Sequence, residues 1–203
     1  VTYIKHLKMK KIFSVLTLAS FILSSCNTNV ETKVEIGGPS SEDKAAFEKQ
    51  IETFSAYRKA FNEENIEDLM GTMADSLKWS PPAYNGNEIL GYEDVKATFQ
   101  SYFDQFDNIT FAEGQGLVNK GAPAYWAGST FSSGEGEQGA SSKPNIMRIY
   151  GTWSGIHTES GAKVYNKWYG VLNFNSDGKI ADLSDWMDVS GMQGQIEKHM
   201  ANK

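Results

Sequence analysis

The stretch DGKIADLSDWMDVSGMQGQI, residues 177–196, begins with a turn signal and continues as a strand. Its Asp-Gly pair is typical of a hairpin turn, and the residues after it, which include apolar and aromatic types, predict a strand. Successive side chains of a strand point to opposite faces. One face therefore carries Ala181, Leu183, Asp185, Met187 and Val189. Asp185 is the ionisable member of that face, and we predict that it lies in a pocket.

An acid on an apolar face is suited to moving a proton or to holding a polar group of a ligand. Removal from water disfavours the ionised form, so the pKa of Asp185 should be raised toward neutrality. The alternative is an aspartate that stays wet at the rim of the sheet, or one that accepts a hydrogen bond from a backbone donor.

The turn before this strand sets the register of the hairpin. The sequence NSDGK suits a three-residue loop over 176–178, in which Gly178 takes a left-handed conformation and Asn175 lies opposite Lys179. Counting back from this loop gives the register that we favour. A two-residue turn at Asp177 and Gly178 would shift the register by one residue.

The favoured register has consequences for the pocket. It places Tyr169 opposite Asp185 and Val171 opposite Leu183, so that Val171 joins the pocket face and Tyr169 can reach the acid. The two-residue turn would instead place Gly170 opposite Asp185.

Four further stretches, rich in β-branched and aromatic residues and bounded by turn formers, predict strands of an antiparallel sheet. They are residues 108–118, 124–133, 145–158 and 163–175. The segment SSGEGEQGASSKPN, residues 132–145, is too polar for the core and predicts a long loop.

Three helices are predicted before the strands, each with apolar residues at spacings of three, four or seven that form one buried stripe. The first is capped by Ser40 or Ser41, the second follows Asn65, and the third covers residues 92–106. The stripes are Phe47, Ile51, Phe54 and Phe61, then Ile66, Leu69, Met70 and Met73, then Val95, Phe99, Phe103 and Phe106. The fold class is α+β.

Two segments in the last part of the chain resemble a known family. YGTWSGIHTESG, residues 150–161, is close to a strand of the type W-x-G-x-H-x-G, and residues 177–196 resemble a closing segment of D-G-K-I followed by D-x-x-D-W-x-D. Both are found in the SnoaL-like polyketide cyclases of the nuclear transport factor 2-like superfamily. The resemblance implies a cone-shaped domain over residues 41–203, with N-terminal helices packed on a strongly curved antiparallel sheet. Because this superfold hosts cyclases, isomerases, dehydratases and non-catalytic domains, the match is specific for the fold and not for a reaction.

The resemblance also assigns roles to particular residues. Asp185 matches the acid/base of the cyclases, but where they carry a histidine, six residues before the aspartate of the turn, this chain has Val171. The cyclase reaction therefore does not transfer directly, although Tyr169 or His157 could supply a hydrogen bond. An isolated histidine at a strand end, as His157 is, more often has a structural or simply exposed role than a catalytic one. We expect no metal, because no second histidine is near it, and no cofactor, because no P-loop or Rossmann pattern is present.

The tryptophans admit two interpretations. The Pro-Pro pair in SPPAYNG forces an extended segment, so Trp79 and Tyr84, together with Trp126, could form an aromatic pocket mouth. With Val171, Leu183 and Met187 they would then line a ligand site. In the other interpretation Trp79, Trp126, Trp153 and Trp168 simply fill the interior.

The front of the chain has the pattern of a targeting segment. Four lysines precede an apolar run from Ile12 to Leu23, which is shorter than the roughly 20 residues that a membrane helix needs. LSSC, residues 23–26, resembles the lipobox of bacterial lipoproteins. We therefore expect a signal peptide over 1–25, a lipidated Cys26, a flexible tether over 26–40, and a domain held at the cell envelope, with the outer membrane favoured.

The charge balance excludes one class of partner. Residues 1–25 hold four of the 19 Lys and Arg and none of the 25 Asp and Glu, so 15 basic and 25 acidic residues remain, a formal net charge of −10. Such a chain without a basic cluster lacks the charge that nucleic-acid binding needs.

Three functions are compatible with the sequence. The first is a lipid-anchored module that binds a small, partly apolar molecule, with Asp185 fixing a polar group. The second is an enzyme that uses Asp185 as general acid/base in cyclisation, isomerisation, hydration or dehydration of a carbonyl compound. The third is a protein-interaction module, including a homodimer, that uses the open face of the sheet.

Overall fold

The computed structural model describes residues 40–119, 123–127 and 146–203. The elements in chain order are α2 (Ser41–Asn62), α3 (Ile66–Gly71), β1 (Met73–Ser80), α4 (Tyr92–Gln105), β2 (Phe106–Glu113), β3 (Tyr125–Ala127), β4 (Ile146–His157), β5 (Lys163–Phe174), β6 (Ile180–Met187) and α5 (Val189–Ala201). The predicted signal peptide, Cys26, all of the tether except residue 40, and the predicted loop 132–145 lie outside the described residues.

Helix α2 begins where the sequence predicted. Ser40 accepts a hydrogen bond from the backbone N–H of Asp43 at 3.0 Å, and the Asp43 carboxylate accepts one from the backbone N–H of Ser40 at 3.2 Å. This reciprocal capping satisfies two N–H groups that have no partner inside the helix. The buried stripe of α2 includes Phe54, Tyr57 and Phe61.

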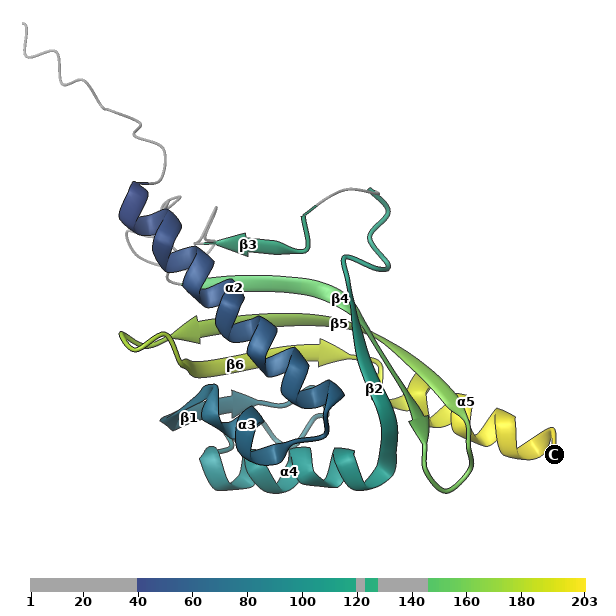
Figure 1. Ribbon diagram of the computed structural model, residues 1–203. Coiled ribbons are helices and arrows are strands. Elements are labelled where there is room, and N and C mark those ends of the chain that lie inside the picture. The colour runs from purple at the N-terminus through teal and green to yellow at the C-terminus, as the bar shows by residue number, and fades with distance from the viewer. Residues whose placement is uncertain (1–39, 120–122, 128–145) are drawn as a thin grey trace, which may run out of the picture. The chain divides into compact units, whose positions relative to one another are not determined.

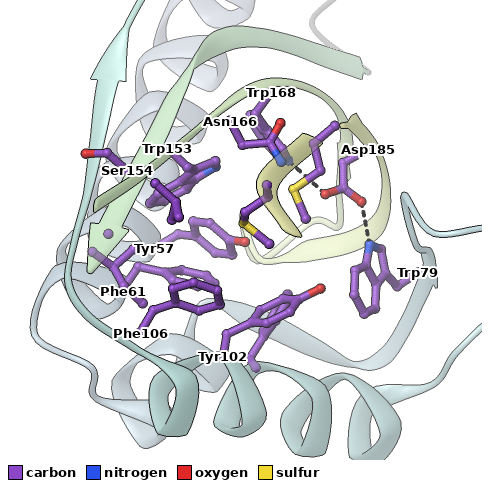
Figure 2. Close-up of a pocket in the computed structure, with 16 residues that line it drawn as sticks. Tyr57, Phe61, Trp79, Tyr102, Phe106, Trp153, Ser154, Asn166, Trp168 and Asp185 are labelled. Atoms are coloured by element: carbon purple, nitrogen blue, oxygen red, sulfur yellow. Dashed lines mark hydrogen bonds between the residues drawn. The ribbon is translucent and has the colours of Figure 1, made fainter. Parts of the chain in front are cut away.

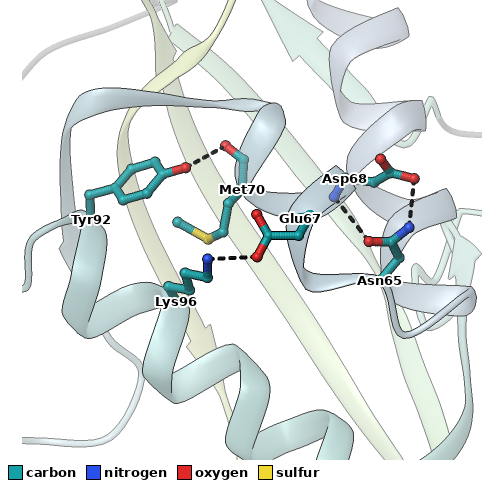
Figure 3. Close-up of polar contacts among 6 residues, drawn as sticks. All are labelled: Asn65, Glu67, Asp68, Met70, Tyr92 and Lys96. Atoms are coloured by element: carbon teal, nitrogen blue, oxygen red, sulfur yellow. Dashed lines mark hydrogen bonds and ion pairs between the residues drawn. The ribbon is translucent and has the colours of Figure 1, made fainter.

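Helices α3 and α4 are joined by polar contacts at their surface (Figure 3). Lys96 of α4 donates to Glu67 of α3 at 2.7 Å, and the Tyr92 hydroxyl donates to the backbone carbonyl of Met70 at 3.3 Å. Asn65 caps α3 by accepting from the backbone N–H of Asp68 at 3.1 Å. Val95, Phe99 and Phe103 of the predicted stripe are buried on α4, whereas Phe106, which was predicted in this helix, is buried as the first residue of β2.

The sheet has the order β1-β6-β5-β4-β2, with β3 paired to β4. The pairs among β2 to β6 are antiparallel, as predicted, but β1 lies parallel to β6. The sheet is therefore mixed. Met73 was predicted to continue the second helix, yet it begins β1, because α3 ends at Gly71 and the backbone carbonyl of Thr72 accepts from Ile180 at 3.0 Å. The buried Leu77 and Trp79 at alternate positions were the available signal for this strand.

One face of the sheet is covered by helices. Figure 1 shows α2 lying across the sheet, with α3 and α4 beside β1. The Phe54 ring of α2 stacks on Trp168 of β5 at 5.9 Å between centroids and meets the edge of Phe111 of β2 at 5.7 Å. The register shifts within the β2–β4, β1–β6 and β5–β6 pairs, and such bulges bend the strands around the buried face.

Helix α5 was not predicted from the sequence, because the residues through Val189 were interpreted as a strand. The strand ends at Met187, and Asp188 caps the helix by accepting from the backbone N–H of Gly191 at 2.8 Å. Met192 and the buried Ile196, four residues apart, were the signal for it.

Candidate functional site

The predicted alternation of β6 is confirmed around Asp185. Asp185 is buried, with 8 % of its surface exposed, whereas its neighbour Trp186 is 55 % exposed on the other face. Leu183, two residues before Asp185, is buried in the core, and Met187, two residues after it, lines a cavity.

The register predicted for the hairpin is wrong by one residue. The loop itself forms as expected, since Asn175 donates to the carbonyl of Lys179 at 2.9 Å and Gly178 has φ of 77°. A register shift just after it, between Asn173 and Phe174, then places Gly170 opposite Asp185. The count from the loop failed because a bulge inserts an unpaired residue, which moves every later side chain to the other face.

The shift removes two predicted residues from the pocket. Tyr169 and Val171 pair with Trp186 and Ser184, so they lie on the face of the sheet away from Asp185. Val171, which stands where the cyclases carry a histidine, therefore does not line the cavity with Asp185.

Between the helices and the sheet lies a cavity of about 90 Å³, which Figure 2 shows with Asp185 at one side. Its lining is largely aromatic and comes from every layer of the fold. It consists of Tyr57, Phe61, Trp79, Phe99, Tyr102, Phe106, Ile109, Trp153, Ser154, Gly155, Val164, Asn166, Trp168, Asp185, Met187 and Met192. Since one water needs about 10–15 Å³ by this measure, the cavity has room for several water-sized groups.

Two indoles hold the Asp185 carboxylate. Trp79 Nε1 donates to Oδ1 at 2.8 Å and Trp168 Nε1 donates to Oδ2 at 2.7 Å. Burial raises the pKa of Asp185 to about 6, while the hydrogen bonds from Trp168 and Trp79 act in the opposite direction. Desolvation therefore outweighs the two donors, and the carboxyl changes its charge close to neutral pH. The prediction that burial would raise this pKa agrees with the geometry.

Two tyrosines place their hydroxyls beside the same cavity. In Figure 2 the side chains of Tyr57 from α2 and Tyr102 from α4 reach toward its interior. Burial raises the pKa of Tyr102 to about 12 and that of Tyr57 well above its usual value, and the negative charge of Asp185 adds to both shifts. Both groups therefore stay protonated as neutral hydroxyls through the physiological range.

These residues had weak sequence signals. Tyr57 and Tyr102 continue the helical stripes of Phe54 and Phe99 three residues on, and a tyrosine on a buried stripe brings a hydroxyl that needs a partner. Trp168 was considered only as a filler of the interior. Its role as a donor to Asp185 depends on the register of the β5–β6 hairpin, and the predicted register was wrong by one residue.

The face of the sheet away from the cavity carries a row of aromatic side chains. Trp126, Tyr150, Tyr169 and Trp186 come from four neighbouring strands, with centroid distances of 5.0, 4.5 and 5.4 Å between successive rings. We call these four residues the aromatic row. Trp126 was predicted at the pocket mouth, but its pairing opposite Arg148 places it in this row.

Two other predicted site residues also lie away from the cavity. Tyr84 is 86 % exposed. His157 is at the end of β4, where its Nδ1 accepts from the backbone N–H of Ser160 at 3.3 Å and its ring lies 5.6 Å from that of Phe106. Through these contacts His157 stabilises the turn between β4 and β5. Of the predicted ligand contacts, Asp185, Trp79 and Met187 therefore line the cavity together.

Neither a metal site nor a membrane span is found in the part of the chain that the structure describes. No three His, Cys, Asp or Glu residues gather there, and none of its helices is long and apolar enough to cross a membrane.

Known structures share this architecture. No protein-family model and no curated protein matches the sequence. The pinacolase BvnE from Penicillium brevicompactum is 15 % identical with a TM-score of 0.55, covering 78 % of this chain and 94 % of that protein. A protein described as a SnoaL-like polyketide cyclase from Shewanella denitrificans is 13 % identical with a TM-score of 0.50, covering 73 % and 97 %. The chain has the nuclear transport factor 2-like fold.

A third similar structure contains a ligand. It is a protein with a ketosteroid isomerase-like fold from Catenulispora acidiphila, solved in complex with trimethylamine. It is 12 % identical with a TM-score of 0.51, covering 72 % of this chain and 92 % of that one. At such identities the likeness establishes the fold, so function has to be argued from the site.

Proposed function

We propose that this protein binds a small, partly apolar molecule in the cavity and that Asp185 contacts a polar group of that molecule. The observation that carries the proposal is the buried Asp185 carboxyl, held by Trp79 and Trp168 at the wall of an aromatic cavity. Small-molecule sites are typically apolar concavities with a few placed polar groups. The SnoaL-like and ketosteroid isomerase-like architectures of similar structures are consistent with ligand binding or catalysis.

The proposal includes the location of the protein. The lipobox-like residues 23–26 support lipidation at Cys26 and attachment to a bacterial membrane, with the outer membrane favoured. The domain would then sample small molecules outside the cytoplasm.

Binding can be tested by saturation-transfer NMR with a library of apolar fragments of fewer than about ten non-hydrogen atoms, a size matched to the cavity. We expect Val164→Phe to abolish the binding of hits, because Val164 lines the cavity and a larger ring fills it. Tyr84→Ala is the control and should leave binding unchanged, since Tyr84 is 86 % exposed. Hits that still bind to Val164→Phe would contradict the proposal.

Catalysis by Asp185 is the second candidate, and the pKa of about 6 favours it. If carbonyl-containing hits exchange the hydrogen next to the carbonyl in D2O, and Asp185→Asn abolishes this exchange, the enzymatic alternative replaces simple binding.

Homodimerisation through the open sheet face is the third candidate, and the aromatic row favours it because Trp186 leaves 55 % of its surface exposed there. We expect Trp186→Ser to shift the purified protein from dimer to monomer in sedimentation velocity. Tyr84→Ser removes an exposed ring elsewhere and should not. A wild-type protein that is monomeric at high concentration would exclude this interface.

A further inference from the structure

Several of the hydrogen-bond donors at the cavity are already used within the protein. The indole N–H groups of Trp79 and Trp168 are used by Asp185. The Asn166 side chain is also used, donating to the backbone carbonyl of Asp188 and accepting from its N–H, each at 2.9 Å. The wall also carries the indole of Trp153 and, toward Asp185, the hydroxyls of Tyr57 and Tyr102, which can accept as well as donate.

The charge of the cavity is also one-sided. Among the described residues that line it, Asp185 is the only one with a formal charge at neutral pH, and no Lys, Arg or His is present. Buried charges in proteins are usually paired with an opposite charge. When Asp185 is ionised, the two indoles stabilise it as neutral donors, and no protein cation along the described wall completes the pair.

We propose that the molecule bound in the cavity is a small organic cation, a tertiary or quaternary amine whose charge lies against Asp185. This rests on the binding function proposed above and adds the chemical class of the ligand.

The aromatic wall supports this class of ligand. Faces of Trp and Tyr attract alkylammonium groups, with Trp the strongest, and the effect grows when the cation is removed from water. Trp79, Trp153 and Trp168 line the cavity together with Tyr57 and Tyr102. A carboxylate has about four lone-pair positions, so two remain after the indole bonds for a ligand N–H or for close approach of a methylated ammonium. A ligand with a carboxylate would meet like charge.

The groups that face Asp185 keep their charge state between pH 5 and pH 7.5, so a change of binding with pH in this range can be assigned to Asp185. Trp79 faces it from β1, Trp168 from β5, Tyr57 from α2 and Tyr102 from α4, and α5 contributes the uncharged Met192. The two tyrosines keep their protons throughout the range from pH 5 to pH 7.5. Asp185 is then the group at the cavity wall that changes its charge in this range, consistent with its pKa of about 6.

The test uses three molecules of nearly the same shape that differ in charge. They are choline, 3,3-dimethylbutan-1-ol and 3,3-dimethylbutanoate, with affinities for the purified protein measured by calorimetry or NMR titration at pH 5 and pH 7.5. The charge of choline does not change with pH. We expect choline to bind about tenfold tighter than the alcohol at pH 7.5, and the carboxylate not to bind.

Lowering the pH to 5 should weaken choline binding about tenfold, because only about a tenth of Asp185 is then ionised and the apparent affinity falls by that fraction. The alcohol should not weaken. Asp185→Asn should remove the choline preference, whereas Asp182→Asn, a charge change on the exposed face of the same strand, should keep it. The pH response of the wild type gives the answer even if Asp185→Asn folds poorly.

Three outcomes would overturn the inference. Alcohol binding as tight as choline binding at pH 7.5 would exclude the cation and leave the proposed binding of a small molecule intact. If the affinity for choline changes neither with pH nor in Asp185→Asn, the cation does not bind against Asp185. If none of the three molecules binds, the cation inference fails, while the fragment screen with Val164→Phe still decides the proposed function.

Discussion

Replacing Gly170 by valine should lower the free energy of unfolding by about 3 kcal/mol, at the upper end of what overpacking of a core usually costs. A Cβ atom at this position would overlap the six-membered ring of Trp168, which folds over Gly170, and its Cζ3 atom would be only 2.8 Å away. The ring cannot yield easily, because Phe54 stacks on it at 5.9 Å and Phe111 meets it edge-on at 5.7 Å. Chemical denaturation monitored by circular dichroism measures the loss.

The same substitution should also disturb the site, because a displaced Trp168 no longer donates to Asp185. We therefore expect Gly170→Val to lose binding of cavity ligands at temperatures where it is still folded. Gly194→Ala is the matched control. Gly194 is an exposed position of α5 with no atom within 4 Å of an added Cβ, so Gly194→Ala should stabilise the protein by about 0.5–1 kcal/mol through helix propensity. If Gly170→Val is as stable as the wild type, Trp168 is not held as described.

The fold was largely predictable because its signals are local. The cap at Ser40, the stripe of Val95, Phe99 and Phe103, and the strand-forming stretch around Leu172 each act over a few residues. Helix α5 and strand β1 were missed although both had periodic signals. Each begins directly after another element, β1 after α3 and α5 after β6, so its pattern was interpreted as a continuation of that element.

The site was predictable only in part, because it depends on register. The burial of Asp185 follows from the alternation within its own strand, and was predicted correctly. Its neighbours come from the partner strand, so one bulge exchanged Tyr169 for Trp168 as the residue beside it. Trp79 reaches Asp185, 106 residues away in the chain, only because β1 pairs with β6. No local sequence pattern predicts that contact.

The stability of the protein should depend on pH through Asp185. In the folded protein its pKa is about 6, whereas the value for the unfolded chain is close to 3.8. Between these values the folded state holds a proton that the unfolded state has lost, so the stability decreases as the pH rises from about 4 to about 6 and is level above that. At 1.36 kcal/mol per pKa unit, the contribution of Asp185 changes by about 3 kcal/mol in total, of which about 2 kcal/mol is lost between pH 4 and pH 6.

This contribution is isolated by comparing the wild type with Asp185→Asn, whose amide does not ionise. The free energy of unfolding of the wild type, measured by urea denaturation from pH 4 to pH 7.5, should fall by about 2.4 kcal/mol relative to that of the variant. Asp182→Asn changes a charge on the exposed face of the same strand and should retain the pH dependence of the wild type. A constant difference between wild type and Asp185→Asn would mean that the carboxyl has an ordinary pKa.

Trp168→Phe separates the two opposing causes of the shifted pKa. The variant keeps an aromatic ring at the position but removes the N–H that donates to Oδ2 at 2.7 Å. Since this hydrogen bond favours the ionised carboxylate, its loss should raise the pKa of Asp185 further and extend the fall in stability to higher pH. If the midpoint instead moved down, water entering beside the smaller ring would have relieved the desolvation that burial imposes. The direction in which the pH midpoint moves therefore shows whether the loss of the Trp168 hydrogen bond or a reduced desolvation has the larger effect on the pKa of Asp185.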